Sequence, residues 1–206
     1  MRKQSRTCIV VAKDQQGRII MAGDRRVSAH WGLAYICPNP KIKKHPHNIL
    51  VGASGDSSLC KFLLDGFVPS PHDEGTPDDY MYLDYIPTLT ENIKLILGCR
   101  DGHGLLKFST SEYCSALFVV SNIVYTLDLY SAGSEESDQG VSRIILDDAP
   151  IPYAIGCGAA SAMPILLEEF NKKGYNTKAT ILRAMQIAAE ISPGCDANID
   201  FIISKA

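Results

Sequence analysis

The order of apolar runs along the chain limits its possible folds most strongly. Residues 9–12 and 19–22 are β-rich and flank a polar loop at residues 13–17, so they predict a hairpin. Further strands are expected at residues 41–44, 48–53, 116–120, 123–127, 142–146, 153–155 and 199–203. Helices are expected from near residues 54–57, over 89–99, from 159 and from 177, the last with Thr177 as its cap. Residues 68–80 are expected to form an exposed loop. Hairpins and helices that both come in pairs predict an α+β fold. In it, two mainly antiparallel sheets pack face to face with a helix layer outside each, as a four-layer αββα sandwich.

The composition is that of one globular domain. A length of 206 residues fits a single domain, and 46% hydrophobic with 21% charged residues exclude a disordered chain. A net charge of −3 gives no basic excess for binding nucleic acid. Seven cysteines without a CxxC pair suit reduced thiols in the cytosol. The apolar run after Arg6 is too short for a signal peptide, and no segment reaches the ~18 apolar residues of a membrane helix. We therefore predict a cytoplasmic protein.

Thr7 opens the first predicted strand and offers a candidate nucleophile. A threonine hydroxyl is a poor nucleophile unless a base lies beside it, and one such base is the threonine's own α-amine. That amine exists only when the Arg6–Thr7 bond has been cut. The sequence therefore predicts a leader at residues 1–6 and a single domain at residues 7–206, whose activity depends on cleavage of one peptide bond.

Several short motifs follow Thr7 in order. They are AGDRR at residues 22–26, Lys41, GASGD at residues 52–56 and YAIGCG at residues 153–158. Together with Thr7, these motifs resemble the proteasome β-type family of N-terminal-nucleophile hydrolases, which includes the HslV-like peptidases. The resemblance covers roughly the whole chain after residue 6.

The resemblance implies a catalytic role for each of four residues. Thr7 Oγ would attack a peptide carbonyl, and its α-amine would accept the hydroxyl proton near neutral pH. Lys41 would place a positive charge beside that oxygen, and Asp24 would keep the lysine charged and oriented. The amide of Gly55 would donate to the developing oxyanion. An acyl-enzyme ester at Thr7 would then be hydrolysed by water. Taken singly, each residue also suits an ordinary strand, turn or surface position.

The chain departs from the family pattern at two positions near the expected site. Arg6 stands where self-processing members have glycine, and a bulky residue there hinders the tight geometry of an acyl shift. Cys157 replaces the serine of the family's Gly-Ser-Gly segment, and a thiol is a weaker hydrogen-bond donor than a hydroxyl. Arg26, in the AGDRR motif at residues 22–26, is a further candidate supporting residue.

The family also uses a carboxylate and a hydroxyl shortly before the last strand. Here Ser192 or Cys195 could take the hydroxyl's place, and Asp196 or Glu190 could supply the charge. The sequence does not decide between these assignments.

The resulting hypothesis is a threonine endopeptidase that acts on peptides or unfolded proteins and needs no cofactor or metal. The resemblance implies self-association into rings or a helical assembly, with an AAA+ ATPase as a possible partner, and no nucleic acid or membrane. Two alternatives stay open. In the first, the leader is retained and the chain is a catalytically silent structural subunit. In the second, the chain is an amidohydrolase of the same nucleophile class that acts on a small amide.

Overall fold

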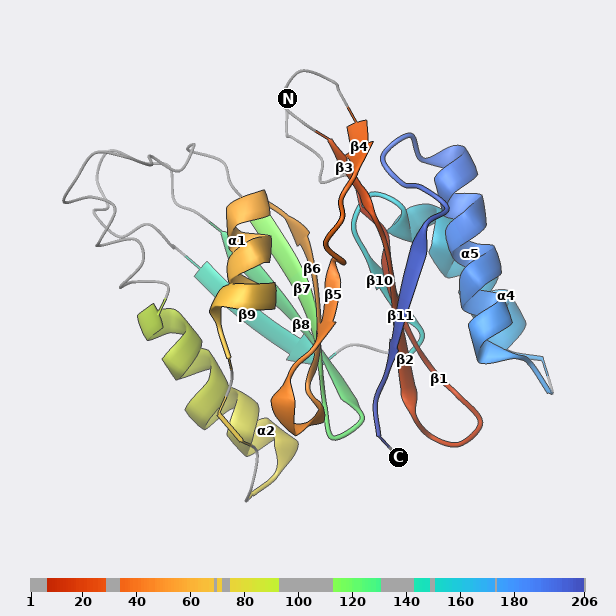
Figure 1. The fold of residues 1–206 in the computed structure, drawn as a ribbon. Helices are drawn as coiled ribbons and strands as arrows, with labels where there is room; N and C mark the ends of the chain where they lie inside the picture. The colour runs from red at the N-terminus through yellow and green to blue at the C-terminus, as the bar shows by residue number, and fades with distance from the viewer. Residues whose placement is uncertain are drawn as a thin grey trace.

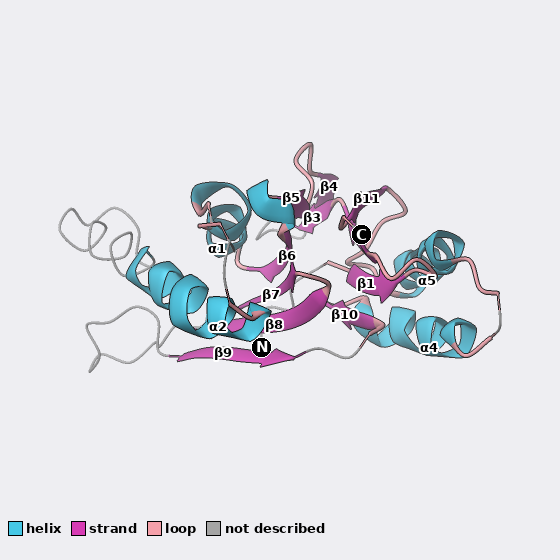
Figure 2. Ribbon diagram, turned by 90° about the horizontal axis from the view of Figure 1, so that it is seen from below, coloured by secondary structure: helices cyan, strands magenta, loops and turns pink. Residues whose placement is uncertain are grey.

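Two sheets stacked face to face, with helices on both outer sides, form the body of the protein (Figure 1). The structure is a computed structural model, and it describes residues 7–28, 34–68, 70–71, 75–92, 113–130, 143–148, 151–172 and 174–205. This arrangement is the predicted α+β sandwich. The two sheets lie between α1 and α2 on one side and α4 and α5 on the other (Figure 2).

The first sheet has the strand order β10-β1-β2-β11, and all its neighbours are antiparallel. Its strands are β1 (Ile9–Lys13), β2 (Ile19–Asp24), β10 (Tyr153–Ile155) and β11 (Ile199–Ile203). Successive side chains of a strand point to opposite faces, and here both faces are covered. Val10 packs toward the helices α4 (Ala159–Phe170) and α5 (Thr177–Ile191), whereas Ile9 packs toward the second sheet. Because both faces are buried, β1 reads as a continuous apolar run.

The second sheet has the strand order β5-β6-β7-β8-β9 and is also antiparallel. Its strands are β5 (Ile42–Lys44), β6 (Leu50–Gly55), β7 (Tyr113–Val120), β8 (Ile123–Tyr130) and β9 (Arg143–Asp148). The outer face is covered by α1 (Ser57–Lys61), a π-helical turn at Phe62–Gly66 and the segment that starts with α2 (Pro77–Asp79) and continues as helix to residue 92. Between the sheets, a separate apolar cluster that includes Ile9, Met21 and Leu50 holds the two layers together.

Three local expectations from the sequence were wrong. Residues 68–80 were expected as loop and the next helix at 89–99, but the helix already begins at Pro77. There Thr76 and Asp79 form a capping box, which fixes the start. Helix α5 is capped by Asn176, whose side chain accepts from the amide of Ala179 at 3.1 Å, rather than by Thr177.

The structure also contains a short hairpin that the sequence did not predict. It consists of β3 (Arg26–Ser28) and β4 (Ala34–Ile36), which pair antiparallel. The predicted leader at residues 1–6 and residues 93–99 of the predicted second helix lie outside the described residues. Of the helices that the structure describes, none combines the length and the apolar character that crossing a membrane requires.

Candidate active site

Thr7 lies just before β1 and is held by contacts on both sides of its backbone. Its carbonyl accepts from the amide of Gly158 at 3.2 Å, and its own amide donates to the sulfur of Cys157 at 3.3 Å. Only 5% of Thr7 is exposed. The turn between β10 and α4 therefore fixes the position of the candidate nucleophile.

Lys41 brings a positive charge directly to the Thr7 hydroxyl. Its Nζ donates to Thr7 Oγ1 at 2.9 Å and to Asp24 Oδ1 at 3.0 Å, and it also bonds to the main-chain carbonyl of Arg26. Thr7 and Asp24 adjoin strands of the first sheet, whereas Lys41 immediately precedes β5 of the second. The structure therefore brings together three of the four residues to which the resemblance assigns catalytic roles.

Asp24 is fully buried and receives three hydrogen bonds. Besides Lys41, the amide of Cys8 donates to Oδ1 at 2.9 Å and the amide of Arg26 donates to Oδ2 at 3.1 Å. Burial raises the pKa of Asp24, and the charge of Lys41 and the hydrogen bonds from the two main-chain amides oppose that rise. Because all three partners are donors, the arrangement fits the carboxylate form.

Gly55 lies at the end of β6, just before α1 begins at Ser57. Its φ of 134° is a conformation that side-chain-bearing residues rarely adopt. The preceding Ser54 reaches the turn that holds Thr7, because a Cβ on Gly156 would lie 3.1 Å from Ser54 Oγ. The structure thus places the predicted oxyanion glycine next to a residue that borders the Thr7 turn.

Gly156 is a positioning residue that the sequence analysis did not single out. It has a φ of 88°, and a Cβ there would lie 2.2 Å from the carbonyl oxygen of Thr7. No Cβ tolerates a backbone atom at that distance. Gly156 belongs to the YAIGCG motif that the sequence already showed, but its closeness to Thr7 depends on the pairing of β10 with β1.

We expect Gly156→Ala to be strongly destabilising, because the new methyl group would displace the Thr7 carbonyl. Gly174→Ala is a matched control, since Gly174 also has a positive φ of 76° but a Cβ there would meet nothing within 4 Å. Backbone strain alone should cost Gly174→Ala about 1–2 kcal/mol. Gly156→Ala should cost about 4 kcal/mol or more, or prevent folding. Urea unfolding of both variants measures the difference, and equal losses would show that the Thr7 turn accommodates a side chain.

Two thiols support the amide side of Thr7. Cys157 Sγ, which accepts from Thr7, lies 3.7 Å from Cys195 Sγ. The hydrogen bond with Cys195 and burial raise the pKa of Cys157 well above its usual range. The bond with Cys157 lowers the pKa of Cys195, but contact with Cys8 and burial outweigh it and raise that pKa to about 12. Both groups are therefore neutral thiols, which argues against Cys157 as the nucleophile in this state.

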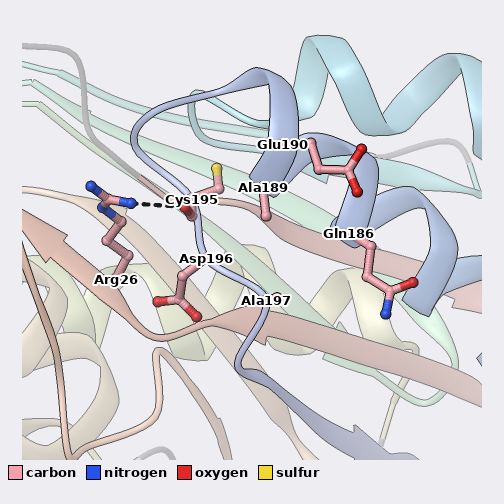
Figure 3. Close-up of a pocket in the computed structure, with 7 residues that line it drawn as sticks. All are labelled: Arg26, Gln186, Ala189, Glu190, Cys195, Asp196 and Ala197. Carbon is pink, nitrogen blue, oxygen red and sulfur yellow. Dashed lines mark hydrogen bonds between the residues drawn. The ribbon is translucent and has the colours of Figure 1, made fainter.

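A pocket of about 520 Å³ is lined in part by Cys195, one member of this thiol pair (Figure 3). Arg26 lines it and donates through Nη1 to the carbonyl of Cys195 at 3.4 Å. Glu190 and Asp196 also line it, and Glu190 is exposed. Arg26 and Cys195 therefore connect the pocket to the groups that surround Thr7.

Two of the candidate supporting residues bond elsewhere. The hydroxyl of Ser192 lies 3.5 Å from that of Ser161, and Asp196 Oδ1 accepts from the amide of Asn198 at 2.5 Å. Cys195, rather than Ser192, lies behind the amide side of Thr7.

Several solved structures are similar in fold to this chain. A Thiobacillus denitrificans BPH structure in complex with epoxomicin aligns with a TM-score of 0.65 and 15% identity, over 97% of this chain and 98% of the other. Eukaryotic HslV from Trypanosoma brucei aligns with a TM-score of 0.59 and 16% identity, over 97% of this chain and 100% of the other. The helical assembly of the Anbu complex from Pseudomonas aeruginosa aligns with a TM-score of 0.57 and 12% identity, over 96% of this chain and 80% of the other. The chain has the proteasome-like N-terminal-nucleophile hydrolase fold.

At these identities, the likeness shows the fold alone. No family model matches the sequence, and no curated protein matches it. In the proteasome-like fold of this chain, the start of β1 is where the contacts of Lys41, Asp24 and Cys157 meet. The function of the site has to be argued from those contacts.

Proposed function

We propose that the chain is a threonine-type peptidase whose nucleophile, Thr7, becomes active when residues 1–6 are removed. The observation that carries this proposal is the position of Lys41 Nζ, 2.9 Å from Thr7 Oγ1 and 3.0 Å from the buried carboxylate of Asp24. A positive charge at this distance favours the deprotonated form of the neighbouring hydroxyl. A purely structural threonine at the start of a strand has no need of a buried ion pair.

The free α-amine would occupy the position of the Thr7 amide, where the Cys157 sulfur lies 3.3 Å away. With a free pKa near ~7.7–8, this amine accepts the hydroxyl proton at neutral pH. Thr7 Oγ then attacks the peptide carbonyl, and the amine returns the proton to the leaving amine. Water hydrolyses the resulting ester.

The developing oxyanion needs a donor on the other side of the reacting carbonyl. We assign this role to the amide of Gly55, because it ends β6 next to Ser54, which borders the Thr7 turn. The left-handed glycine leaves that edge open to a substrate backbone.

Self-association is part of the proposal. The Pseudomonas aeruginosa Anbu structure is described as a helical assembly. In this chain, Tyr82 and Leu83 expose 52% and 70% of their surface on the outer helix, and we assign this helix as a candidate contact between subunits. We propose a ring or helical homo-oligomer, to which an AAA+ ATPase delivers unfolded protein.

The intact mass of the purified, assembled protein tests the first step. We expect a mass that lacks residues 1–6, since only that species carries a free amine on Thr7. A peptidyl epoxyketone such as epoxomicin should then add to Thr7, as shown by peptide mapping.

A full-length mass with complete assembly would instead favour a structural subunit that retains its leader. Arg6 gives this alternative its support, because a bulky residue precedes the scissile bond. Turnover of a small amide without peptide cleavage would favour an amidohydrolase.

A further inference from the structure

Three thiols converge behind Thr7, and the sequence gives no role to them as a group. Cys157 Sγ lies 3.7 Å from Cys195 Sγ, and Cys195 also contacts Cys8. Gly158 makes this packing possible, because a Cβ there would lie 2.7 Å from Cys195 Sγ and 2.6 Å from the Cβ of Cys8. Cys8 and Cys195 are buried, whereas Cys157 is half-buried. Cys157 is therefore the member of the cluster that a small solute reaches first.

We propose that Cys157 and Cys195 form a reversible disulfide bond when the protein meets a hydroperoxide, and that this bond turns the Thr7 site off. The effect on hydrolysis rests on the proposed function, whereas formation of the disulfide does not. A disulfide needs a sulfur–sulfur distance near 2.05 Å, so the two sulfur atoms, now 3.7 Å apart, must approach by about 1.7 Å.

The chemistry balances with hydrogen peroxide as the oxidant. The Cys157 thiolate attacks one peroxide oxygen and forms a sulfur–oxygen bond, while the oxygen–oxygen bond breaks and hydroxide leaves to become water. The Cys195 thiol then attacks the sulfenic sulfur of Cys157. A sulfur–sulfur bond forms, the sulfur–oxygen bond breaks and a second water leaves. Two thiols and one peroxide thus give one disulfide and two waters.

Removal of the leader should control the rate of this oxidation. In the uncleaved chain, the hydrogen bond with Cys195 and burial raise the pKa of Cys157, so the reactive thiolate is scarce. After cleavage, the α-amine would take the position 3.3 Å from this sulfur; with a free pKa near ~7.7–8 it is partly protonated near neutral pH, while its neutral fraction serves as the base for Thr7. A cation at that distance favours the thiolate. The thiol pair therefore becomes sensitive in the form that is competent for hydrolysis.

Formation of the disulfide removes a contact of the general base. The Cys157 sulfur that now accepts from Thr7 would move toward Cys195. Losing one hydrogen bond that orients the amine should lower kcat by about tenfold.

The test treats a chain that begins at Thr7 with hydrogen peroxide and maps its disulfides under non-reducing conditions. We expect a Cys157–Cys195 cross-link, a mass lower by two hydrogen atoms, about a tenfold fall in peptide hydrolysis and recovery with dithiothreitol. The pair Cys60 and Cys114, whose sulfur atoms also lie 3.7 Å apart, is the matched control. No α-amine lies beside it, so it should stay reduced.

Two comparisons make the test decisive. The full-length Thr7→Ala chain, which cannot cleave itself, should form the cross-link at least about tenfold more slowly. The Cys195→Ala and Cys195→Ser variants should form no disulfide at Cys157 and should stop at its sulfenic acid, each judged against its own reduced form.

Equal oxidation of Cys60 and Cys114, a Cys8–Cys195 bond, or equal rates with and without the leader would overturn the proposal. A chain that forms the Cys157–Cys195 bond but cleaves no peptide would support the modification site and contradict the peptidase assignment.

Discussion

Replacing Thr7 with alanine should abolish peptide hydrolysis and leave the fold intact. The substitution removes the hydroxyl on which the mechanism depends, so the rate should fall by more than about 10⁴-fold, to the background of the assay. Lys41 keeps its bonds to Asp24 and to the carbonyl of Arg26, so the buried charge stays compensated. Release of a fluorogenic amide from a peptide measures the effect, with chains that begin at residue 7 so that leader removal is not a variable.

The conservative variant Thr7→Ser is the matched control. It keeps an Oγ within reach of Lys41 and should retain measurable hydrolysis. If the alanine variant turned over substrate as fast as the native chain, Thr7 would have no part in the mechanism.

Replacing Lys41 with methionine should lower hydrolysis by about 10²–10⁴-fold, because the cation beside Thr7 Oγ1 is lost. The same change leaves the Asp24 carboxylate buried without its partner, which costs about 3–5 kcal/mol of stability near neutral pH. Lys43→Met is the control, since Lys43 pairs with Asp65 at the exposed surface and should matter little to either measurement.

The Lys41→Met variant should also become less stable as the pH rises. Burial already raises the pKa of Asp24, and the charge of Lys41 is the largest opposing cause. Without Lys41, that pKa rises further above its value in the unfolded chain, so the folded state binds more protons and stability falls with increasing pH, starting from about pH 4. Adding Asp24→Asn should remove this pH dependence without restoring hydrolysis. Urea unfolding between pH 4 and 8 checks both expectations, and a flat profile for Lys41→Met would contradict them.

The sequence predicted most strands well because the sheets are buried on both faces. Continuous apolar runs such as residues 9–12 have few alternatives to a central strand, and the predicted ends of β10 and β11 agree with the structure. The hairpin of β3 and β4 escaped prediction because its strands are three residues long and Tyr35 and Ile36 are exposed. The early start of the helix at Pro77 was missed because a proline-rich segment suggested a loop, although the Thr76–Asp79 capping box was present in the sequence.

The resemblance to the proteasome β-type family predicted that Thr7, Asp24 and Lys41 meet, whereas their catalytic roles stay predictions. The contacts that fix their geometry could not be foreseen from residue types. The amide of Cys8 binds Asp24 and the carbonyl of Arg26 binds Lys41, and main-chain groups give no signal in a sequence. The choice between Ser192 and Cys195 likewise depended on how the loop after α5 returns toward β10.

Thr7 and Lys41 come from opposite sheets, and this division ties chemistry to folding. A chain with only its first sheet formed would have a threonine without a cation beside it, and a chain with only its second sheet would have a lysine without a hydroxyl or a counter-ion. The Lys41–Thr7 contact therefore forms only after the two layers have docked through the cluster that includes Ile9 and Leu50. If the proposed function holds, an unfinished polypeptide of this kind is harmless to its neighbours, because docking of the two layers has to complete the site before removal of residues 1–6 can activate it.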